Sequence, residues 1–191
     1  VIEIATLLNS QMGMPQLGKP VDMTPLITNP RFKDEFDAGW IGSKLVSDGN
    51  ADNSQFETHE FYHTNFNMYQ KIIGVPNGRY KVKYKGFYNR PNGVENYDPS
   101  DTSTVAVVYA NEVKDPVMHI MAGASNTGVS SFGVDEREYN GKYVPTSQKS
   151  SRQYFDAGYY ASEFEVIVTD NVLTIGVKNT QEMLSGYWVC F

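Results

Sequence analysis

Apolar and polar residues alternate over several short segments of the chain, which is the period of β-strands that have one face in water. In the clearest segment, residues 79–88, basic side chains alternate with an apolar set made of Tyr80, Val82, Tyr84, Gly86 and Tyr88. One face of this predicted strand is therefore apolar, and the other face is mostly charged.

Further strands are predicted along the rest of the chain. Residues 103–110 are almost continuously apolar, which predicts a strand buried on both faces. Residues 163–169 and 173–177 alternate again, and the Asp-Asn pair between them predicts a hairpin because both residue types tolerate a positive φ. Residues 186–191 are predicted to form a closing strand.

The order of the predicted elements gives a fold class. Residues 2–14 are predicted to form a short helix, and we interpret residues 1–20 as a lead-in or linker. Residues 21–191 have the length of a single domain. Within them, strands with polar connections and no strand–helix alternation predict an all-β, antiparallel β-sandwich. The long irregular stretch 123–151 is too long for a hairpin loop and is expected to hold irregular excursions or a short helix.

Composition narrows the possible partners. The chain has 16 basic and 22 acidic residues, a formal net charge of −6, which disfavours sequence-independent binding to nucleic acid and to anionic membranes. No apolar stretch is long enough for membrane insertion. The single cysteine, Cys190, excludes an internal disulfide and a cysteine metal cluster. Aromatic residues make up 13% of the chain, which suits both strands and surfaces that recognise sugars or peptides.

One motif points to catalysis. His59, Glu60 and His63 match the His-Glu-x-x-His pattern of zinc hydrolases, which requires a helix so that both imidazoles share one face. Residues 55–71 lack helical apolar spacing and are rich in aromatic residues that favour strands, in which the two histidines would be about 13 Å apart. The remaining histidine, His119, is not placed as a third ligand. We therefore interpret the match as coincidental and expect no metal site.

Other catalytic patterns are weaker still. The chain has no nucleophile elbow and no phosphate-binding glycine loop. Glu60, Glu163 and Glu165 offer carboxylates for glycoside hydrolysis, but exposed carboxylates on strands more often have no catalytic role. We expect that the protein is not an enzyme, with a zinc-dependent hydrolase as the least favoured alternative.

Several segments together resemble a known family. Residues 22–32, followed by Gly39 and Trp40, look like the opening of galactose-binding-like β-sandwich domains. Segments that match these domains in the same order are residues 60–62, 66–70, 75–80, 86–90, 109–111, 158–163 and 173–176, with Trp188 near the end. The resemblance covers residues 21–191. It implies a jelly-roll that binds carbohydrate without cleaving it, in secreted or cell-surface bacterial proteins with several domains.

The resemblance also bears on metal binding. Family members often carry a carboxylate just after the phenylalanine of the opening strand, at a structural calcium site, whereas this chain has Lys33 there. The chain also stops at Phe191, short of the usual closing sequence. No cofactor is therefore expected, although Asn29, Asp34 and Asp37 offer oxygen ligands for calcium.

A sugar site combines aromatic faces with planar polar side chains. The candidate ligand-binding residues are Arg90, Asn89, Tyr88, Trp40, Tyr62, Asn111, Tyr109 and Trp188. Arg90 ranks first because it follows an apolar strand at the mouth of a loop, while the large aromatics also suit a core. The predicted function is a noncatalytic carbohydrate-binding module. The alternative is a structural or adhesion module that packs on neighbouring domains, which a broad exposed aromatic patch without polar groups would favour.

Overall fold

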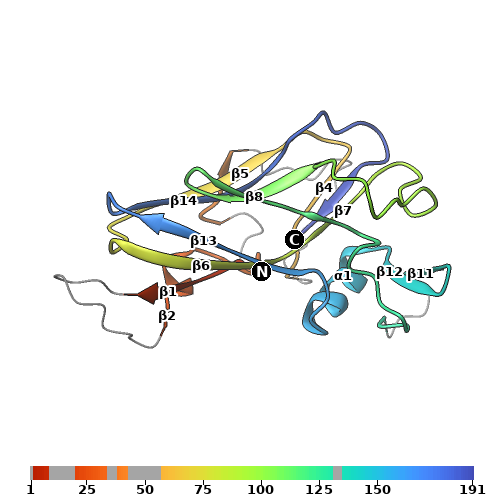
Figure 1. Ribbon diagram of the computed structural model, residues 1–191, viewed down its shortest axis with the longest axis horizontal. Coiled ribbons are helices and arrows are strands. Elements are labelled where there is room, and N and C mark those ends of the chain that lie inside the picture. The colour runs from red at the N-terminus through yellow and green to blue at the C-terminus, as the bar shows by residue number, and fades with distance from the viewer. Residues whose placement is uncertain (1, 9–19, 34–37, 43–56, 131–134) are drawn as a thin grey trace.

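The computed structural model describes residues 2–8, 20–33, 38–42, 57–130 and 135–191 (Figure 1). Strands dominate this part of the chain, and most neighbouring strands are antiparallel. The first sheet has the order β13 (Ala161–Val168), β6 (Gly78–Lys85), β1 (Ile2–Leu8) and β2 (Val21–Asp22). The second has the order β3 (Ile41–Gly42), β5 (Asn67–Ile73), β14 (Val172–Asn179), β8 (Ala106–Ala110) and β9 (Val113–Pro116).

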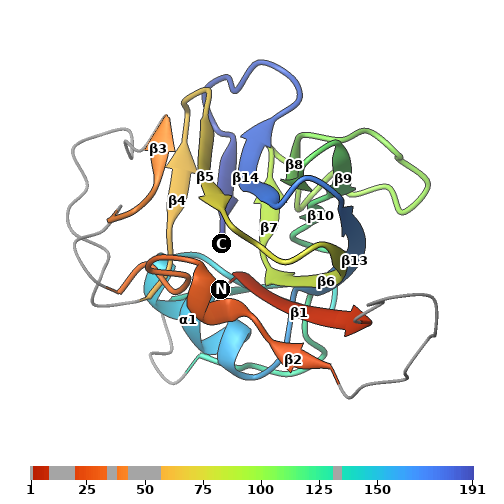
Figure 2. The same cartoon turned by 90° about the vertical axis from the view of Figure 1, so that its left-hand side faces the viewer.

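A third sheet extends one end of the molecule. Its order is β10 (Met118–His119), β7 (Phe87–Asn89), β15 (Trp188–Cys190) and β4 (Glu60–Tyr62), and β10 runs parallel to β7. The remaining elements are the 3-10 turn η1 (Thr24–Leu26), the hairpin of β11 (Glu136–Tyr139) and β12 (Lys142–Pro145), and the helix α1 (Gln148–Asp156). The second sheet lies over the first as a separate layer in both views (Figures 1 and 2).

The main core fills the space between these layers. Tyr80, Val82, Tyr84 and Tyr88 are at most 4% exposed and belong to one apolar cluster with side chains of β1, β8 and β14. The alternation predicted for residues 79–88 is therefore confirmed. Every residue of β8 is buried, as its continuous apolar sequence predicts. Burial of such side chains is the main source of folding free energy.

A second apolar cluster covers the other face of the third sheet. Phe87, Trp188 and Cys190 point to this side and pack against residues of α1 and of β12. The side chain of Ser147 caps α1, and a lysine of β6, Lys85, donates to the carbonyl of Phe155 near the end of the helix. The helix expected within residues 123–151 therefore exists, although most of α1 lies beyond residue 151.

The predicted N-terminal helix is wrong. Residues 2–8 form β1, which pairs with β6 and β2 in the first sheet. Ile2 and Ile4 are at most 1% exposed, and because they are two residues apart they lie on the same face of the strand and enter the main core. The packing of this alternating pair outweighs a weak helical pattern. Residues 9–14 of the predicted helix lie outside the described part of the chain.

The predicted hairpin around Asp170 and Asn171 is also wrong, although both of its strands exist. β13 pairs with β6 in the first sheet, whereas β14 pairs with β5 and β8 in the second. The connection thus carries the chain from one layer to the other. Asn171 has a φ of 59° and hydrogen-bonds to the neighbouring turn at Val75 and Asn77, which fixes this crossing.

None of the helices in the described ranges is long and apolar enough to cross a membrane.

Gly176 in β14 offers a test of the packing of the second sheet. A Cβ atom at this position would lie 2.6 Å from the carbonyl oxygen of Met68 and 2.8 Å from Cζ of Tyr109. We expect Gly176→Ala to lower the free energy of unfolding by about 2 kcal/mol, because backbone and ring must move apart. Urea denaturation measures this difference. Thr174→Ala, on the same strand and face, is the control and should cost less than about 1 kcal/mol; equal losses would contradict the steric explanation.

Candidate functional site

The predicted site residues fall in five different places. Trp40 lies in the main core, only 1% exposed, and its Nε1 donates to the carbonyl of Asn29 at 3.2 Å. Tyr109 lies on the outward face of the second sheet, where its hydroxyl donates to Oδ1 of Asn67 at 2.8 Å. Asn111 occupies the β8–β9 turn and hydrogen-bonds to the backbone of β14. These three side chains have structural roles and do not converge.

Three other predicted residues form a row across the third sheet. Trp188 is the register partner of Tyr62 on β4 and of Asn89 on β7. Trp188 is 9% exposed, and its Nε1 donates to Oε2 of Glu60 at 2.7 Å. Burial raises the pKa of Glu60, with the hydrogen bond from Trp188 acting in the opposite direction. Trp188 and Tyr62 of this row belong to the second apolar cluster, so the row offers little exposed surface to a ligand.

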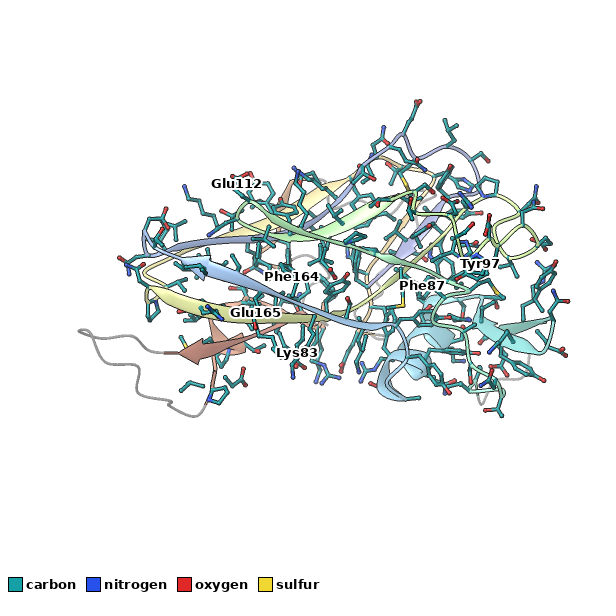
Figure 3. All side chains as sticks on the ribbon, in the orientation of Figure 1. Lys83, Phe87, Tyr97, Glu112, Phe164 and Glu165 are labelled. Atoms are coloured by element: carbon teal, nitrogen blue, oxygen red, sulfur yellow. The ribbon has the colours of Figure 1, made fainter. Side chains whose placement is uncertain are left out.

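The highest-ranked residue, Arg90, lies in a group of polar and aromatic side chains at the end of β7. We call this group the Arg90 cluster; its members are Arg90, Tyr97, Asp101, Ser103 and His119. Nη2 of Arg90 is 2.6 Å from Oδ2 of Asp101, and Nη1 donates to Oγ of Ser103 at 3.5 Å. The two charged side chains are 26% and 28% exposed. Tyr97 is seen toward this end of the molecule, away from Glu165 (Figure 3).

Asp101 is held in one orientation by several hydrogen bonds. Its Oδ1 accepts from the backbone N–H of Ser103 at 2.8 Å, while its Oδ2 accepts from Arg90. The hydrogen bonds from Ser103, and then that from Arg90, lower the pKa of Asp101 to about 2. The hydrogen bond to Asp101 in turn raises the pKa of Arg90. The cluster therefore presents one fixed carboxylate beside one fixed guanidinium at neutral pH.

His119 forms the floor of the cluster, between two tyrosine rings. The Tyr97 ring stacks on the imidazole, with centroids 4.8 Å apart and planes 14° apart, and Tyr88 meets it edge-on at 5.1 Å. Nδ1 accepts from the backbone N–H of Met121 at 3.1 Å, so the proton of the neutral ring is on Nε2. Burial, and then the charge of Arg90, lowers the pKa of His119 to about 4.

Sequence reasoning identified Arg90 of this group, and Tyr88 that contacts it, but missed the other members. Tyr97 and Asp101 follow Arg90 in the same irregular stretch, so their position in the loop was an available signal. His119 gave none, because it reaches the cluster through the parallel pairing of β10 with β7.

The zinc motif does not have the geometry that zinc chemistry requires. His59 and His63 flank the three-residue strand β4 and do not lie on a helix. The His59 ring packs between Phe32 and Phe61, with centroid distances of 5.2 and 4.8 Å. Over the described ranges, no three His, Cys, Asp or Glu side chains are grouped as metal ligands.

The other acidic candidates are also separated. Glu163 pairs with Lys81 at 2.8 Å and Glu165 with Arg79 at 3.6 Å, both on the first sheet, whereas Glu60 belongs to the third. They do not form the facing pair that glycoside hydrolysis needs. Of the calcium candidates, Asp34 and Asp37 lie outside the described residues, and Oδ1 of Asn29 accepts from the backbone of Lys33.

Comparison with protein-family models, curated proteins and solved structures found no match to this chain.

The state of His119 predicts a specific pH dependence of stability. Its pKa in the folded chain is about 4, against an ordinary value of 6.5, so between these pH values the unfolded chain binds a proton that the folded chain does not. We expect the free energy of unfolding to fall by up to about 3 kcal/mol from this group as the pH is lowered from 7 to 4. Urea denaturation at several pH values measures it. His119→Gln keeps an acceptor for Met121 without titrating, and equal pH profiles for the two proteins would contradict the prediction.

Proposed function

We propose that this chain is a noncatalytic carbohydrate-binding module, a jelly-roll of the galactose-binding-like type, and that it binds sugar at the Arg90 cluster. The observation that carries the proposal is the partly exposed pair of Arg90 and Asp101 together with the Tyr97 ring, which stacks on His119, whose imidazole feels the charge of Arg90. Its setting would be a secreted or cell-surface bacterial protein in which neighbouring domains carry the catalytic or anchoring functions.

The chemistry of the pair suits sugar hydroxyls. A hydroxyl both donates and accepts a hydrogen bond, and a guanidinium next to a carboxylate supplies one partner of each kind. Ser103 and Arg90 together hold Asp101 in place before a ligand arrives. A preorganised partner loses less conformational entropy on binding, which matters for a small ligand.

The aromatic part of the cluster suits the apolar face of a sugar ring. Stacking on His119 uses one face of Tyr97 and fixes the plane of its ring. The Tyr97 side chain remains partly exposed, so its ring also contributes apolar surface to the mouth of the site. Convergent polar groups around an aromatic ring are the usual makeup of a small-ligand site.

The alternative, a structural or adhesion module, receives less support from the surface. The large apolar side chains that are exposed in the described ranges are all aliphatic, namely Val21, Leu26, Ile41, Ile73, Val113, Ile167 and Leu184. In these ranges, the exposed large apolar side chains therefore do not form the broad aromatic patch that would favour this alternative.

Calorimetry after a glycan-array screen tests the proposal. Arg90→Ala removes the guanidinium and frees Asp101, and we expect it to weaken binding at least tenfold, about 1.4 kcal/mol, with a nearly unchanged melting temperature. Tyr97→Ala should weaken binding as well. Trp40→Ala should instead lower the melting temperature, because Trp40 is a core residue.

Arg79→Ala is the matched control. Arg79 is also a partly exposed arginine paired with a carboxylate, Glu165, but it lies on the first sheet away from the Arg90 cluster. Binding should be unaffected by this change. Absence of binding to any glycan, or equal binding by the Arg90→Ala variant, would reject the proposal and favour the structural module.

A further inference from the structure

We propose that His119 is a specificity-determining residue of the Arg90 cluster: its Nε2–H donates to the ligand, and the site selects uncharged sugars that carry two adjacent free hydroxyls. This inference rests on the proposed function and names the ligand class of the same site.

The first observation is a buried donor without an acceptor. The His119 side chain is 6% exposed, and Nε2 has no hydrogen-bond partner within the described residues. Because Nδ1 already accepts from Met121, the proton on Nε2 is fixed there as a donor. Buried polar groups are nearly always paired, and an exception calls for an explanation such as an absent ligand.

The second observation is the position of this donor. Nδ1 faces the Met121 amide, so Nε2 lies on the opposite edge of the ring. The Tyr88 ring contacts the imidazole, and its hydroxyl donates to the carbonyl of Ser103, whose own hydroxyl accepts from Arg90. The donor therefore belongs to the same group of side chains as the ion pair.

The third observation is the balance of donors, acceptors and charges. The cluster offers donors from His119 and Arg90 and an acceptor on Asp101. Two neighbouring hydroxyls satisfy this set, since one accepts from the imidazole while the other bonds to the ion pair. An acidic sugar would instead meet the carboxylate of Asp101 and that of nearby Asp98, both of which have lowered pKa values, with Arg90 already paired.

Binding at Nε2 requires a local rearrangement. Nε2 is inaccessible to solvent. Its N–H points outward in the plane of the imidazole, so the side chains along that edge of the ring must move before a ligand oxygen reaches it, while Tyr97 stays stacked on the face of the ring. The Nε2–H resonance of His119 in an NMR spectrum should therefore shift downfield when sugar binds.

The test uses the whole chain and matched probes: the methyl glycosides of galactose, glucose and mannose, their singly deoxygenated analogues, and the corresponding uronic acids. We expect the best of the three glycosides to bind at least tenfold more tightly than its uronic acid and than an analogue lacking one of two adjacent hydroxyls. His119→Phe should lose at least tenfold in affinity. His119→Gln, which keeps a donor, should retain more of the binding than His119→Phe.

The outcomes separate this inference from the proposed function. If a neutral glycoside binds and Arg90→Ala abolishes binding, but His119→Phe binds as tightly as the parent protein, the role of His119 is rejected and the sugar site stands. Equal affinity for the uronic acid rejects the ligand class in the same way. An unshifted His119 Nε2–H resonance at saturation also rejects the role, even where His119→Phe is too unstable to measure. Failure of all sugars to bind rejects both proposals.

Discussion

The close approach of the C-terminal residues to Gly86 is the contact on which the rest of this structure depends. A Cβ atom at Gly86 would lie 2.6 Å from the Phe191 ring and 3.1 Å from the carbonyl oxygen of Cys190. Because the position has no side chain, β15 can lie against the chain where β6 ends and β7 begins. Residues 78–89 therefore contribute β6 to the first sheet and β7 to the third sheet without an intervening loop. Arg90 directly follows the last residue of β7.

The same arrangement sets the composition of the Arg90 cluster. Along β7, Tyr88 points to the main core while Phe87 points to the second apolar cluster. Parallel pairing brings His119 beside Tyr88, and the loop after Arg90 returns Asp101 to the guanidinium. The ion pair of Arg90 and Asp101 is partly exposed, and such pairs contribute little to the stability of a fold. The strand pairing thus positions Tyr88 and His119, and the loop positions Asp101.

Local sequence pattern predicted the elements of this fold better than their partners. The alternation in residues 79–88 and the apolar run at 103–110 determine which faces are buried, because strand period and burial are local properties. Strand pairing is not a local property. Asp170 and Asn171 are residue types that favour hairpin turns, yet β13 before them and β14 after them belong to different sheets. In the sequence, Ile4, Leu7 and Leu8 fit one face of a helix, whereas Ile2 and Ile4 fit one face of a strand, and only the neighbouring β6 decides between the two. For the same reason the sequence does not place His119 beside Tyr88, because that neighbourhood comes from the pairing of β10 with β7.

The two histidine environments show why side-chain surroundings indicate chemistry better than spacing does. The zinc-hydrolase pattern requires a helix of 3.6 residues per turn. Here the same residues surround the strand β4, and the His59 ring packs between Phe32 and Phe61. His119 belongs to no motif, but its backbone hydrogen bond to Nδ1 fixes the tautomer and its burial keeps the ring neutral. A neutral imidazole with a fixed N–H donates a hydrogen bond without carrying charge, which is what the proposed recognition of an uncharged sugar requires. The chemistry follows from the contacts around the ring and not from its place in the sequence.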